Sequence, residues 1–214
     1  MSSSPQPGPG SAARPQRLIL ATRNAHKVAE LRAILADAGL AVETVGADSY
    51  PEIPDVKETG VTFAENALLK ARTLADATQL PAVADDSGLC VDVLGGAPGI
   101  FSARWAGRHG DDEANLDLLL AQLADISAPH RGAHFACAAA LALPDGTQRV
   151  AEGRLFGTLR HAPAGDGGFG YDPILQPDGE TRTCAELSPE EKNAISHRGK
   201  AFRELAPMVA ELLG

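Results

Sequence analysis

The segment VADDSGL (residues 83–89) places two carboxylates, Asp85 and Asp86, at the end of a short apolar run. Adjacent residues of an extended strand point to opposite faces of the sheet, so only one of the two could face a cleft if the chain stays extended. A bend from Asp86 onward would bring both carboxylates to one spot, where they repel unless a cation lies between them or one stays protonated. Asp, Ser and Gly are also common in surface turns without function. We therefore predict short strands within residues 81–89 and 90–94, around an acidic turn.

The chain that follows this segment predicts helices and a long β-hairpin. Residues 94–107 are a loop-rich crossover, and residues 111–126 have the apolar spacing of an amphipathic helix. Residues 132–159 predict a hairpin of two long strands. The C-terminal part predicts a short helix that begins with the capping box Ser188-Pro189-Glu190-Glu191, a break at residues 196–199, and a terminal amphipathic helix.

The N-terminal part predicts a strand, a polar loop and a helix. RLILA (17–21) is typical of a buried strand, and residues 22–27 follow it as the loop. Residues 28–39 carry apolar side chains at helical spacing, and Gly39 is a candidate C-terminal cap. A helix that starts after such a loop points free N–H groups and its positive dipole end at an anion.

The next part of the chain predicts a second such unit. Residues 41–45 form a plausible strand, and residues 51–60 form a loop that contains Glu58. Thr62-Phe63-Ala64-Glu65 fits a capping box that opens a helix carrying Lys70, which gives Glu65 a structural role. Two strand–loop–helix units followed by a pair of long antiparallel strands indicate a mixed sheet in an α/β fold.

Composition limits the partners and the compartment. The formal charge of −9 argues against a nucleic-acid polymer as partner, although a few lysines and a divalent metal can still hold one small anion. Cys90, Cys137 and Cys184 are widely separated, which favours reduced thiols in a cytoplasmic protein. No apolar run reaches the roughly 18 residues of a membrane span. Residues 1–16, rich in Ser, Pro and Gly, predict a disordered tail, which leaves residues 17–214 as a single domain.

Two features resemble known nucleotide-binding or hydrolase motifs but lack the context that these motifs require. Residues 165–170 match the G-x-G-x-x-G pattern, but a dinucleotide-binding loop must follow a strand and open a helix, whereas this one runs into Tyr171-Asp172-Pro173. Its glycines fit a flexible rim that lets Phe169 or Tyr171 lie against a flat ligand, or a simple connector. Ser87 lacks the G-x-S-x-G elbow of a serine hydrolase, and the two preceding aspartates oppose charge on its oxygen. A Walker A loop is absent.

Taken singly, the remaining candidates have ordinary explanations. Lys27 fits a solvated helix start, Glu58 a loop charge, and His197 a helix cap. Their order along the chain is more specific: a T-x-N-x-x-K loop before a helix, a loop glutamate, a helix lysine, an Asp-Asp-Ser-Gly segment, a Gly-Phe-Gly-Tyr-Asp-Pro rim and a Ser-His-Arg-Gly break. Such a set is suited to holding a nucleoside triphosphate together with a metal ion.

Five stretches carry a resemblance to a known family. They are LATRNAHKVAELRAIL, ETGVTFAENALLKA, PAVADDSGLCVDVLGGAPGIFSARWAG, GDGGFGYDP and AELSPEEKNAISHRGKAF, and the resemblance spans essentially residues 17–213. In these stretches the sequence resembles the inosine triphosphate pyrophosphatase family of non-canonical purine nucleotide pyrophosphatases, in its bacterial form.

The resemblance implies a fold, an activity and an assembly. The implied fold is α/β, a two-lobed mixed β-sheet with flanking helices and the active site in the cleft between the lobes. The implied reaction is hydrolysis of ITP, dITP and XTP to the monophosphate and pyrophosphate with Mg²⁺, which keeps deaminated purines out of DNA and RNA. The family also implies a homodimer.

The resemblance assigns roles position by position. The phosphate-binding loop would be Thr22, Arg23, Asn24, Ala25, His26 and Lys27. Lys27 and Lys70 would neutralise the triphosphate, and Ser87 would touch it. The metal carboxylates would be Glu58, Asp86 and Asp85, with Asp86 also the catalytic residue that accepts a proton from the attacking water. The base-binding set would be Phe169, Gly170, Tyr171, Asp172, Lys192, His197 and Arg198.

Elementary chemistry is consistent with these roles. Hydrolysis of a phosphoanhydride depends mostly on positioning and charge neutralisation, and Mg²⁺ takes oxygen ligands, commonly one or two carboxylates together with phosphate oxygens. On this view the repulsion between the carboxylates of Asp85 and Asp86 is offset, because a dication and the lysines that bind the triphosphate lie between them.

Base selectivity requires hydrogen-bond donors. Hypoxanthine and xanthine present an acceptor oxygen at C6, where adenine presents an amino donor, so donors from His197, Arg198 or backbone N–H groups would favour the former. Mismatched buried polar groups can discriminate on the order of 10⁴-fold. Phe169 would supply a stacking surface. No residue is assigned to the exclusion of the 2-amino group of GTP.

Three other functions remain compatible with these residues. A related pyrophosphatase could prefer modified pyrimidine triphosphates, which a substrate profile distinguishes. A nucleotide-sensing protein would bind without turnover, and Asp86→Asn would then remove no activity. A general metal phosphohydrolase would release orthophosphate rather than pyrophosphate.

Overall fold

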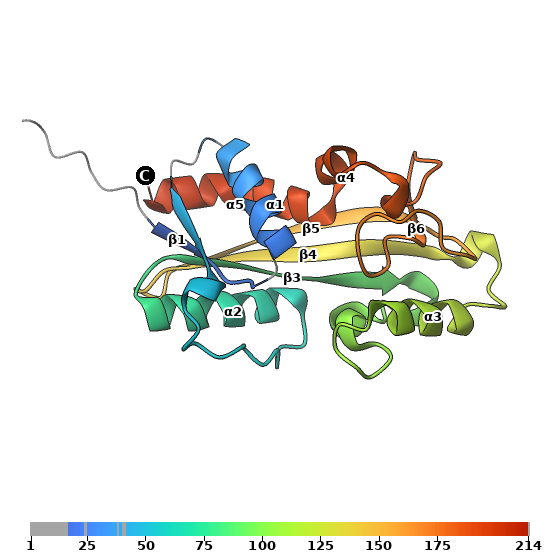
Figure 1. Cartoon of the computed structure of the whole chain (residues 1–214), viewed down its shortest axis with the longest axis horizontal. Coiled ribbons are helices and arrows are strands. Elements are labelled where there is room, and N and C mark those ends of the chain that lie inside the picture. Colours follow the sequence, from blue (N-terminus) through green and yellow to red (C-terminus); the bar gives the residue numbers. More distant parts are fainter. Residues whose placement is uncertain (1–16, 24, 38, 40–41, 214) are drawn as a thin grey trace, which may run out of the picture.

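A six-stranded mixed sheet with helices on both sides forms the centre of the molecule (Figure 1). The computed structural model describes residues 17–23, 25–37, 39 and 42–213. The predicted tail and Asn24 lie outside these residues, as do the side chains of Ala25 and His26. The strands are β1 (Arg17–Leu20), β2 (Glu43–Gly46), β3 (Ala82–Val91), β4 (Gly132–Ala142), β5 (Gln148–Leu159) and β6 (Leu175–Pro177). The α-helices are α1 (Ala25–Asp37), α2 (Phe63–Thr78), α3 (Asp112–Gln122), α4 (Pro189–Ile195) and α5 (His197–Leu213).

The strand order confirms the predicted mixed sheet. It runs β2-β1-β3-β4-β5-β6, with β1 parallel to both β2 and β3 and with every later pair antiparallel. The predicted hairpin is the pair β4–β5. Strands β3, β4 and β5 extend along the length of the molecule, while β1, β2 and α1 lie at one end and α3, α4 and β6 at the other (Figure 1). These ends are the two lobes that the sequence predicted, and we call them the first and second lobe.

The predicted acidic turn is wrong. Residues 82–91 form one uninterrupted strand of ten residues, β3, and each of them is paired with a residue of β4. Asp86 lies opposite Ala138, and Ser87 lies opposite Cys137. A bend would break this ladder, whereas the small side chains of β4 let it continue past the carboxylates. Asp85 and Asp86 consequently point to opposite faces of the sheet.

Strand β3 becomes an edge just where the carboxylates lie. Strand β1 pairs with β3 only at Ala82 and Val83, and the next pairing on that side within the described residues is the isolated bridge between Cys90 and Pro98. Between these points the side of β3 opens toward the gap between the lobes. Side chains on both faces of the strand can therefore reach the same space around its edge.

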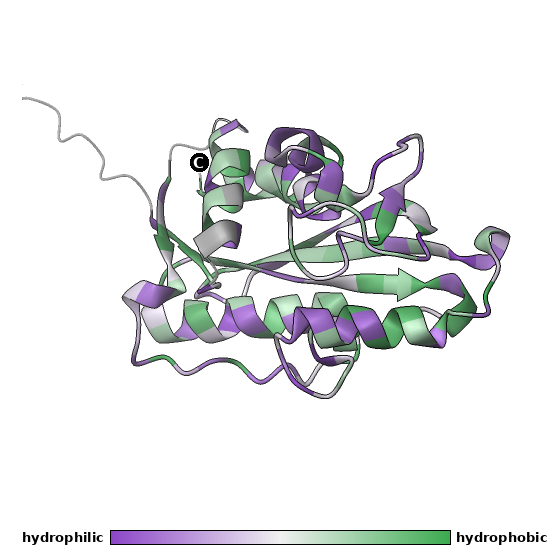
Figure 2. Ribbon diagram, turned by 45° about the vertical axis from the view of Figure 1, so that its right-hand side comes forward, coloured by the Kyte–Doolittle hydropathy of each residue, from purple (hydrophilic) through white to green (hydrophobic). Residues whose placement is uncertain are grey.

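The alanine-rich sequence explains the close packing of helices on this sheet. On one side α1 and α5 cover β1, β3 and β4 through a cluster that includes Leu31, Leu205 and Phe202, all almost fully buried. On the other side α2 packs Ala67 and Ala71 on the small residues of β4. Figure 2 shows the helices with mixed hydrophilic and hydrophobic residues, as amphipathic helices require.

Several predicted boundaries shift by a few residues. The first helix begins at Ala25 rather than at residue 28, and the described part of the second strand is Glu43–Gly46. The break predicted at residues 196–199 is confined to Ser196, because α5 begins at His197. The capping box at Ser188 is confirmed, and all three cysteines are free thiols. No helix among the described residues is long and apolar enough to cross a membrane.

Candidate active site

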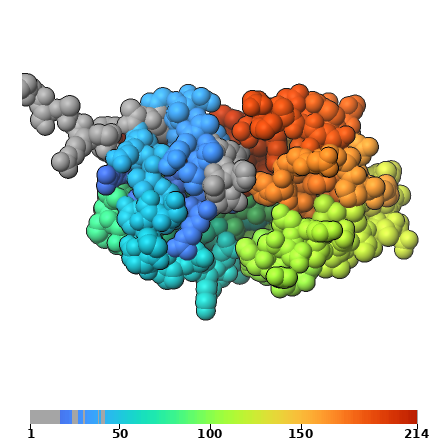
Figure 3. All heavy atoms as spheres, viewed as in Figure 1, coloured from blue at the N-terminus to red at the C-terminus, as the bar shows by residue number. Residues whose placement is uncertain are grey.

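A cleft of about 830 Å³ lies along the open edge of β3. In the space-filling view the blue and cyan segments of the first lobe lie on one side, and the orange and yellow-green segments of the second lobe lie on the other (Figure 3). The cleft brings together nearly all of the predicted site residues that the structure describes. They are Thr22, Arg23, Lys27, Glu58, Lys70, Asp85, Asp86, Ser87, Phe169, Gly170, Tyr171, Asp172, Lys192, His197 and Arg198.

Asp86 lies on the α2 face of the sheet within a hydrogen-bond network. Its Oδ1 accepts from the Lys70 ammonium at 3.1 Å, and its Oδ2 accepts from Nδ2 of Asn66 at 3.1 Å. The Glu58 carboxylate accepts from the same Lys70 ammonium at 3.0 Å. A loop carboxylate and a strand carboxylate thus contact the same lysine of α2. Lys70 also lines the cleft, as its predicted role at the triphosphate requires.

The pKa values in this network move in different directions. Burial and the neighbouring Glu58 carboxylate raise the pKa of Asp86, and the opposing attraction of Lys70 does not cancel them. Burial would also raise the pKa of Glu58, but Lys70 and Arg104 together hold it below its ordinary value. Burial would lower the pKa of Lys70, but Asp86, Asp85 and Glu58 raise it. Glu58 and Lys70 are therefore charged at neutral pH, and Asp86 is the stronger base of the two carboxylates.

Asp85 lies on the opposite face and has its own cations. Its Oδ2 accepts from the Lys27 ammonium and from Nε of Arg198, both at 3.1 Å. The Arg198 guanidinium also donates to Oγ of Ser87 at 3.0 Å. Burial opposes ionisation of Asp85, but Lys27, Arg198 and Lys70 hold its pKa far below the ordinary value. Asp85 and Asp86 thus have separate cationic partners on opposite faces of β3, and the arrangement of both carboxylates around one dication stays a prediction.

The rim of the second lobe presents one exposed aromatic ring. Phe169 is 48% exposed, and the Lys192 ammonium lies 5.0 Å from its ring centroid. Asp172 fixes this arrangement, because its Oδ2 accepts from Lys192 at 2.5 Å and from the Phe169 N–H at 2.8 Å. Tyr171 is buried instead and donates its hydroxyl to the Ser102 carbonyl at 3.0 Å. Of the two predicted aromatic residues, only Phe169 can stack against a flat ligand.

His197 forms part of the cleft floor as a neutral ring. It stacks on Phe135 with ring centroids 4.9 Å apart. Burial, reinforced by the positive charges of Arg198 and Lys192, lowers the pKa of His197 well below its ordinary value. Its Nδ1 has no hydrogen-bond partner among the described residues. A neutral imidazole can offer one donor and one acceptor nitrogen to a ligand.

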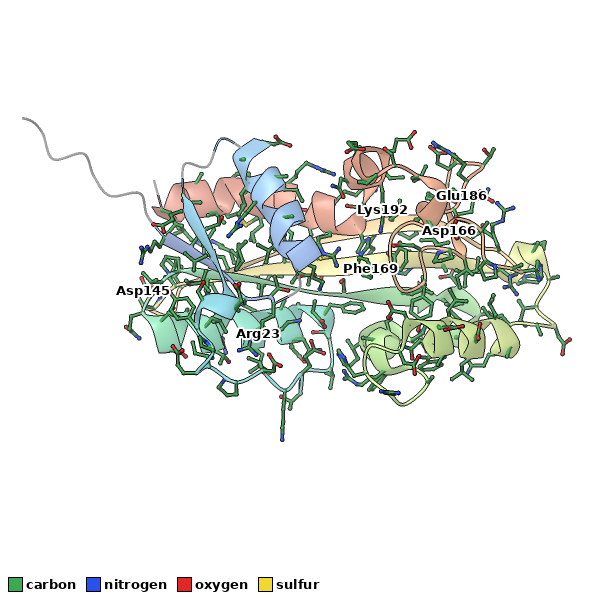
Figure 4. The ribbon with its side chains drawn as sticks, in the orientation of Figure 1. Arg23, Asp145, Asp166, Phe169, Glu186 and Lys192 are labelled. Atoms are coloured by element: carbon green, nitrogen blue, oxygen red, sulfur yellow. The ribbon has the colours of Figure 1, made fainter. Side chains whose placement is uncertain are left out.

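Arg23 connects the predicted phosphate loop to the loop that carries Glu58. Its guanidinium donates to the Asp55 carboxylate and to the Ile53 carbonyl, each at 2.5 Å. Figure 4 shows Arg23 with the first lobe, and Phe169 with Lys192 beside the second lobe. The two lobes therefore contribute different chemistry: cations and carboxylates from one, and an aromatic ring and a lysine from the other.

Two residues of the site were missed from the sequence. Asn66 donates to Asp86 and is fully buried. Arg104 donates to Glu58 at 3.4 Å from the short 3₁₀ helix Gly99–Arg104. Asn66 was detectable, because it precedes Lys70 by four residues and so shares its helix face. Arg104 lies in an irregular segment whose path has no sequence periodicity.

The Glu58–Asp86 pair fits a small hard cation. Both carboxylates contact the single Lys70 ammonium, so their oxygens already surround a positive charge. Among the described residues no group of three or more ligand-type side chains is assembled. A pair of carboxylates is nevertheless the usual protein share of a Mg²⁺ site that substrate phosphates complete. Asp85, the third predicted metal carboxylate, is held on the other face by Lys27 and Arg198.

Comparison with known proteins places this cleft in a family. The model of the Ham1 family matches residues 18–208. The chain belongs to the Ham1 family. This Ham1 chain is 84% identical over 198 residues to a Streptomyces coelicolor protein named dITP/XTP pyrophosphatase, which covers 92% of this chain and 99% of the relative. A Nocardia farcinica protein of the same name is 56% identical and covers 92% of this chain and 96% of the relative.

Solved Ham1 structures share the fold. The Staphylococcus aureus Ham1 protein has a TM-score of 0.83 at 37% identity and covers 92% of this chain and all of that one. The dITP/XTP pyrophosphatase of Mycobacterium abscessus has a TM-score of 0.75 at 52% identity and covers 91% of this chain and 99% of that one. The mixed sheet with flanking helices is thus the fold of this family.

Proposed function

We propose that this Ham1 chain is a Mg²⁺-dependent nucleoside triphosphate pyrophosphatase that hydrolyses dITP, XTP and ITP to the monophosphate and pyrophosphate. One observation carries the proposal: a single cleft combines the Glu58–Asp86 carboxylate pair, a group of cations and an exposed aromatic ring. The names of relatives up to 84% identical support the same activity. The biological role would be to keep deaminated purines out of DNA and RNA.

The metal and the proton acceptor belong to the α2 face of β3. Glu58 and Asp86 would hold Mg²⁺, which supplies charge neutralisation and activates the water that attacks the phosphoanhydride. Asp86 accepts the proton of this water, a role for which its position in the cleft beside Glu58 and Lys70 suits it. Lys70 is then available to the phosphate oxygens as well as to the carboxylates.

The other face of β3 supplies the phosphate-binding cations. Thr22 and Arg23 follow strand β1, and Lys27 lies in the first turn of α1, where N–H groups and the helix dipole favour an anion. Asp85 holds Lys27, which belongs to this set, and also Arg198, which we assign to the base, and it neutralises part of the charge of both. In this proposal Asp85 organises the substrate-binding cations and is not a metal ligand, and Ser87 touches the substrate beside Arg198.

The base binds against the second lobe. Phe169 stacks on the purine, with Lys192 held at its edge by Asp172. Arg198 and the neutral His197 offer donors to the C6 oxygen of hypoxanthine or xanthine, and adenine would set its amino group against them. A site built to hydrogen-bond one group rejects an analogue that cannot pair by on the order of 10⁴-fold.

A homodimer in the cytoplasm completes the proposal. Phe156 on the outer face of β5 is about half exposed, as is Phe101, which lines a groove together with Glu152 and Arg154 of β5. Glu152 and Arg154 on that face form an exposed pair 3.7 Å apart, so a second copy related by a two-fold axis could exchange partners with it. Sedimentation velocity at micromolar concentration decides between a dimer and a 22.2 kDa monomer.

The proposed function is tested by substrate and product analysis. Purified protein with Mg²⁺ is supplied with dITP, XTP, ITP, GTP and ATP in parallel, and pyrophosphate, orthophosphate and monophosphate are quantified. We expect pyrophosphate from the first three and at least about 10²-fold less turnover of ATP. Orthophosphate as the direct product would indicate a general phosphohydrolase, and binding without turnover would indicate a nucleotide sensor. A preference for modified pyrimidine triphosphates would show that the substrates are not purine nucleotides and would favour the related pyrophosphatase.

A further inference from the structure

A fully buried asparagine connects the two carboxylates of the proposed metal site. Asn66 lies in the first turns of α2 and has no exposed surface. Its Nδ2 donates to Oδ2 of Asp86 at 3.1 Å, and its Oδ1 accepts from the N–H of Gly60 at 2.8 Å. Gly60 follows Glu58 by two residues. One amide therefore joins the strand that carries Asp86 to the loop that carries Glu58.

The orientation of this amide is fixed by its two partners. The Gly60 N–H can only donate, so the atom that faces it must be the amide oxygen. The amino group must then face Asp86, whose ionised carboxylate can only accept. An ionised aspartate at position 66 could accept from Gly60 but would repel Asp86, and a leucine could serve neither. Asparagine is the side chain of this size that serves both.

The surrounding residues are arranged around the same contact. A Cβ atom added to Gly60 would lie 2.7 Å from Oδ1 of Asn66 and 2.7 Å from Cβ of Glu65, so the close approach requires glycine. Lys70, one helical turn after Asn66, donates to the other oxygen of Asp86. Helix α2 thus holds both oxygens of Asp86, one through an amide and one through an ammonium.

We propose that Asn66 is a positioning residue that orients the Asp86 carboxylate and sets its distance from the Glu58 loop. The inference rests on the proposed function, in which Asp86 accepts the proton of water and shares a cation with Glu58. A purely structural asparagine would only anchor the loop at Gly60. Asn66 instead contacts Oδ2 of Asp86 and leaves Oδ1 to accept from Lys70, the same ammonium that donates to Glu58.

Two substitutions separate positioning from loop anchoring. Asn66→Asp keeps the acceptor for Gly60 and places a second carboxyl group against Asp86, whereas Asn66→Ala loses both hydrogen bonds. Removal of such supporting contacts commonly costs about 10- to 100-fold in activity or metal affinity. We expect kcat for dITP to fall by this factor in both variants, with KM changed by less than about 3-fold.

A matched control reports the cost of losing a buried asparagine elsewhere. Asn115 in α3 is buried, and its Oδ1 accepts from the Ala106 N–H at 2.7 Å, but it has no contact with a site carboxylate. Nδ2 of Asn115 has no hydrogen-bond partner among the described residues, so Asn115→Ala removes one buried hydrogen bond where Asn66→Ala removes two. Asn115→Ala should lower Tm while kcat stays within about 3-fold of the wild type. A kcat that follows Tm across all three variants would overturn the proposal, as would an Asn66→Ala enzyme with wild-type kcat.

Binding of Mn²⁺ alone provides a readout that does not need turnover. Titration followed by electron paramagnetic resonance should give an affinity about 10-fold weaker in Asn66→Ala than in the wild type or in Asn115→Ala. Equal affinities in the folded proteins would contradict the positioning role. If the wild type turns over no triphosphate, the proposed function fails, and the Mn²⁺ titration still decides the role of Asn66.

Discussion

At the scale of single residues, the strand β3 shows how neighbouring carboxylates acquire different properties. Asp85 has two cations at 3.1 Å, and its pKa is lowered. Asp86 has one cation and a nearby carboxylate, and its pKa is raised. Both are largely buried, so burial alone does not separate them. The difference in pKa follows from the number of cations that contact each carboxylate. The extended backbone of β3 places the two side chains on opposite faces of the sheet, where these cations differ.

The buried neutral His197 predicts a pH dependence of stability. Because burial lowers its pKa in the folded state, the unfolded chain binds a proton below pH of about 6.5 that the folded chain does not. The free energy of unfolding should therefore decrease as pH falls from about 6.5 toward 5, by up to about 1.4 kcal/mol per pH unit from this residue. His197→Phe keeps a ring against Phe135 and cannot take the proton.

Urea denaturation across this pH range measures the effect. The slope of stability against pH should be smaller in His197→Phe than in the wild type. His130→Gln is the control, because His130 is exposed and should leave the slope unchanged. Parallel slopes for the wild type and His197→Phe would show that His197 takes up its proton equally in both states.

At the scale of elements, the second lobe is secured by a buried arginine. Arg131 is 1% exposed, and its guanidinium donates to the carbonyls of Leu123, Leu159 and Arg160 at 2.6–2.9 Å. These carbonyls belong to the ends of α3 and β5. One side chain thus satisfies backbone groups that the two elements leave unpaired at their ends.

Loss of the Arg131 side chain should lower the free energy of unfolding substantially. Arg131→Ala leaves several buried carbonyl groups without donors, at about 1–3 kcal/mol each, so we expect a loss of about 3 kcal/mol or more. Arg149→Ala is the control on the exposed end of β5 and should stay within about 0.5 kcal/mol of the wild type. Urea denaturation at neutral pH compares them. A loss below about 1 kcal/mol for Arg131→Ala would mean that water replaces the guanidinium.

Elements with regular patterns could be predicted from the sequence, and those defined by tertiary contacts could not. The hairpin β4–β5 and helix α2 carry clear periodicity, and both are confirmed. The Thr62 cap of α2 is confirmed, but the Glu65 carboxylate accepts from the Val61 N–H, so the predicted capping box is half formed. The segment 83–89 has the composition of a turn, but its conformation is decided by the ladder with β4, which lies about 50 residues further along the chain. The local β-propensity of a segment does not reveal a pairing partner so far along the chain.

At the scale of the whole molecule, the cleft arises because the sheet is only partly paired. Strand β1 leaves β3 after Val83, and the two lobes diverge from that point. The sequence located most of the cleft residues, because the resemblance aligns them along the chain. It misassigned their geometry, since whether Asp85 and Asp86 share a face depends on the sheet. Arg104 was missed because its contact with Glu58 joins two irregular segments. Asn66 was detectable from its helical spacing to Lys70, but its partner Asp86 is defined only by the packing of α2 on β3.

The division of work between the two faces of β3 is tested most directly by comparing Asp86→Asn with Asp85→Asn. The measurements are kcat for dITP, nucleotide affinity by calorimetry and the free energy of unfolding. We expect Asp86→Asn to lose about 10²–10⁴-fold in kcat while it stays folded and binds nucleotide. Asp85→Asn leaves Lys27 and Arg198 with unbalanced charge, so it should lose about 3–5 kcal/mol of stability and retain more turnover than Asp86→Asn. A folded Asp86→Asn enzyme with turnover close to the wild type would contradict the assignment of Asp86 as proton acceptor.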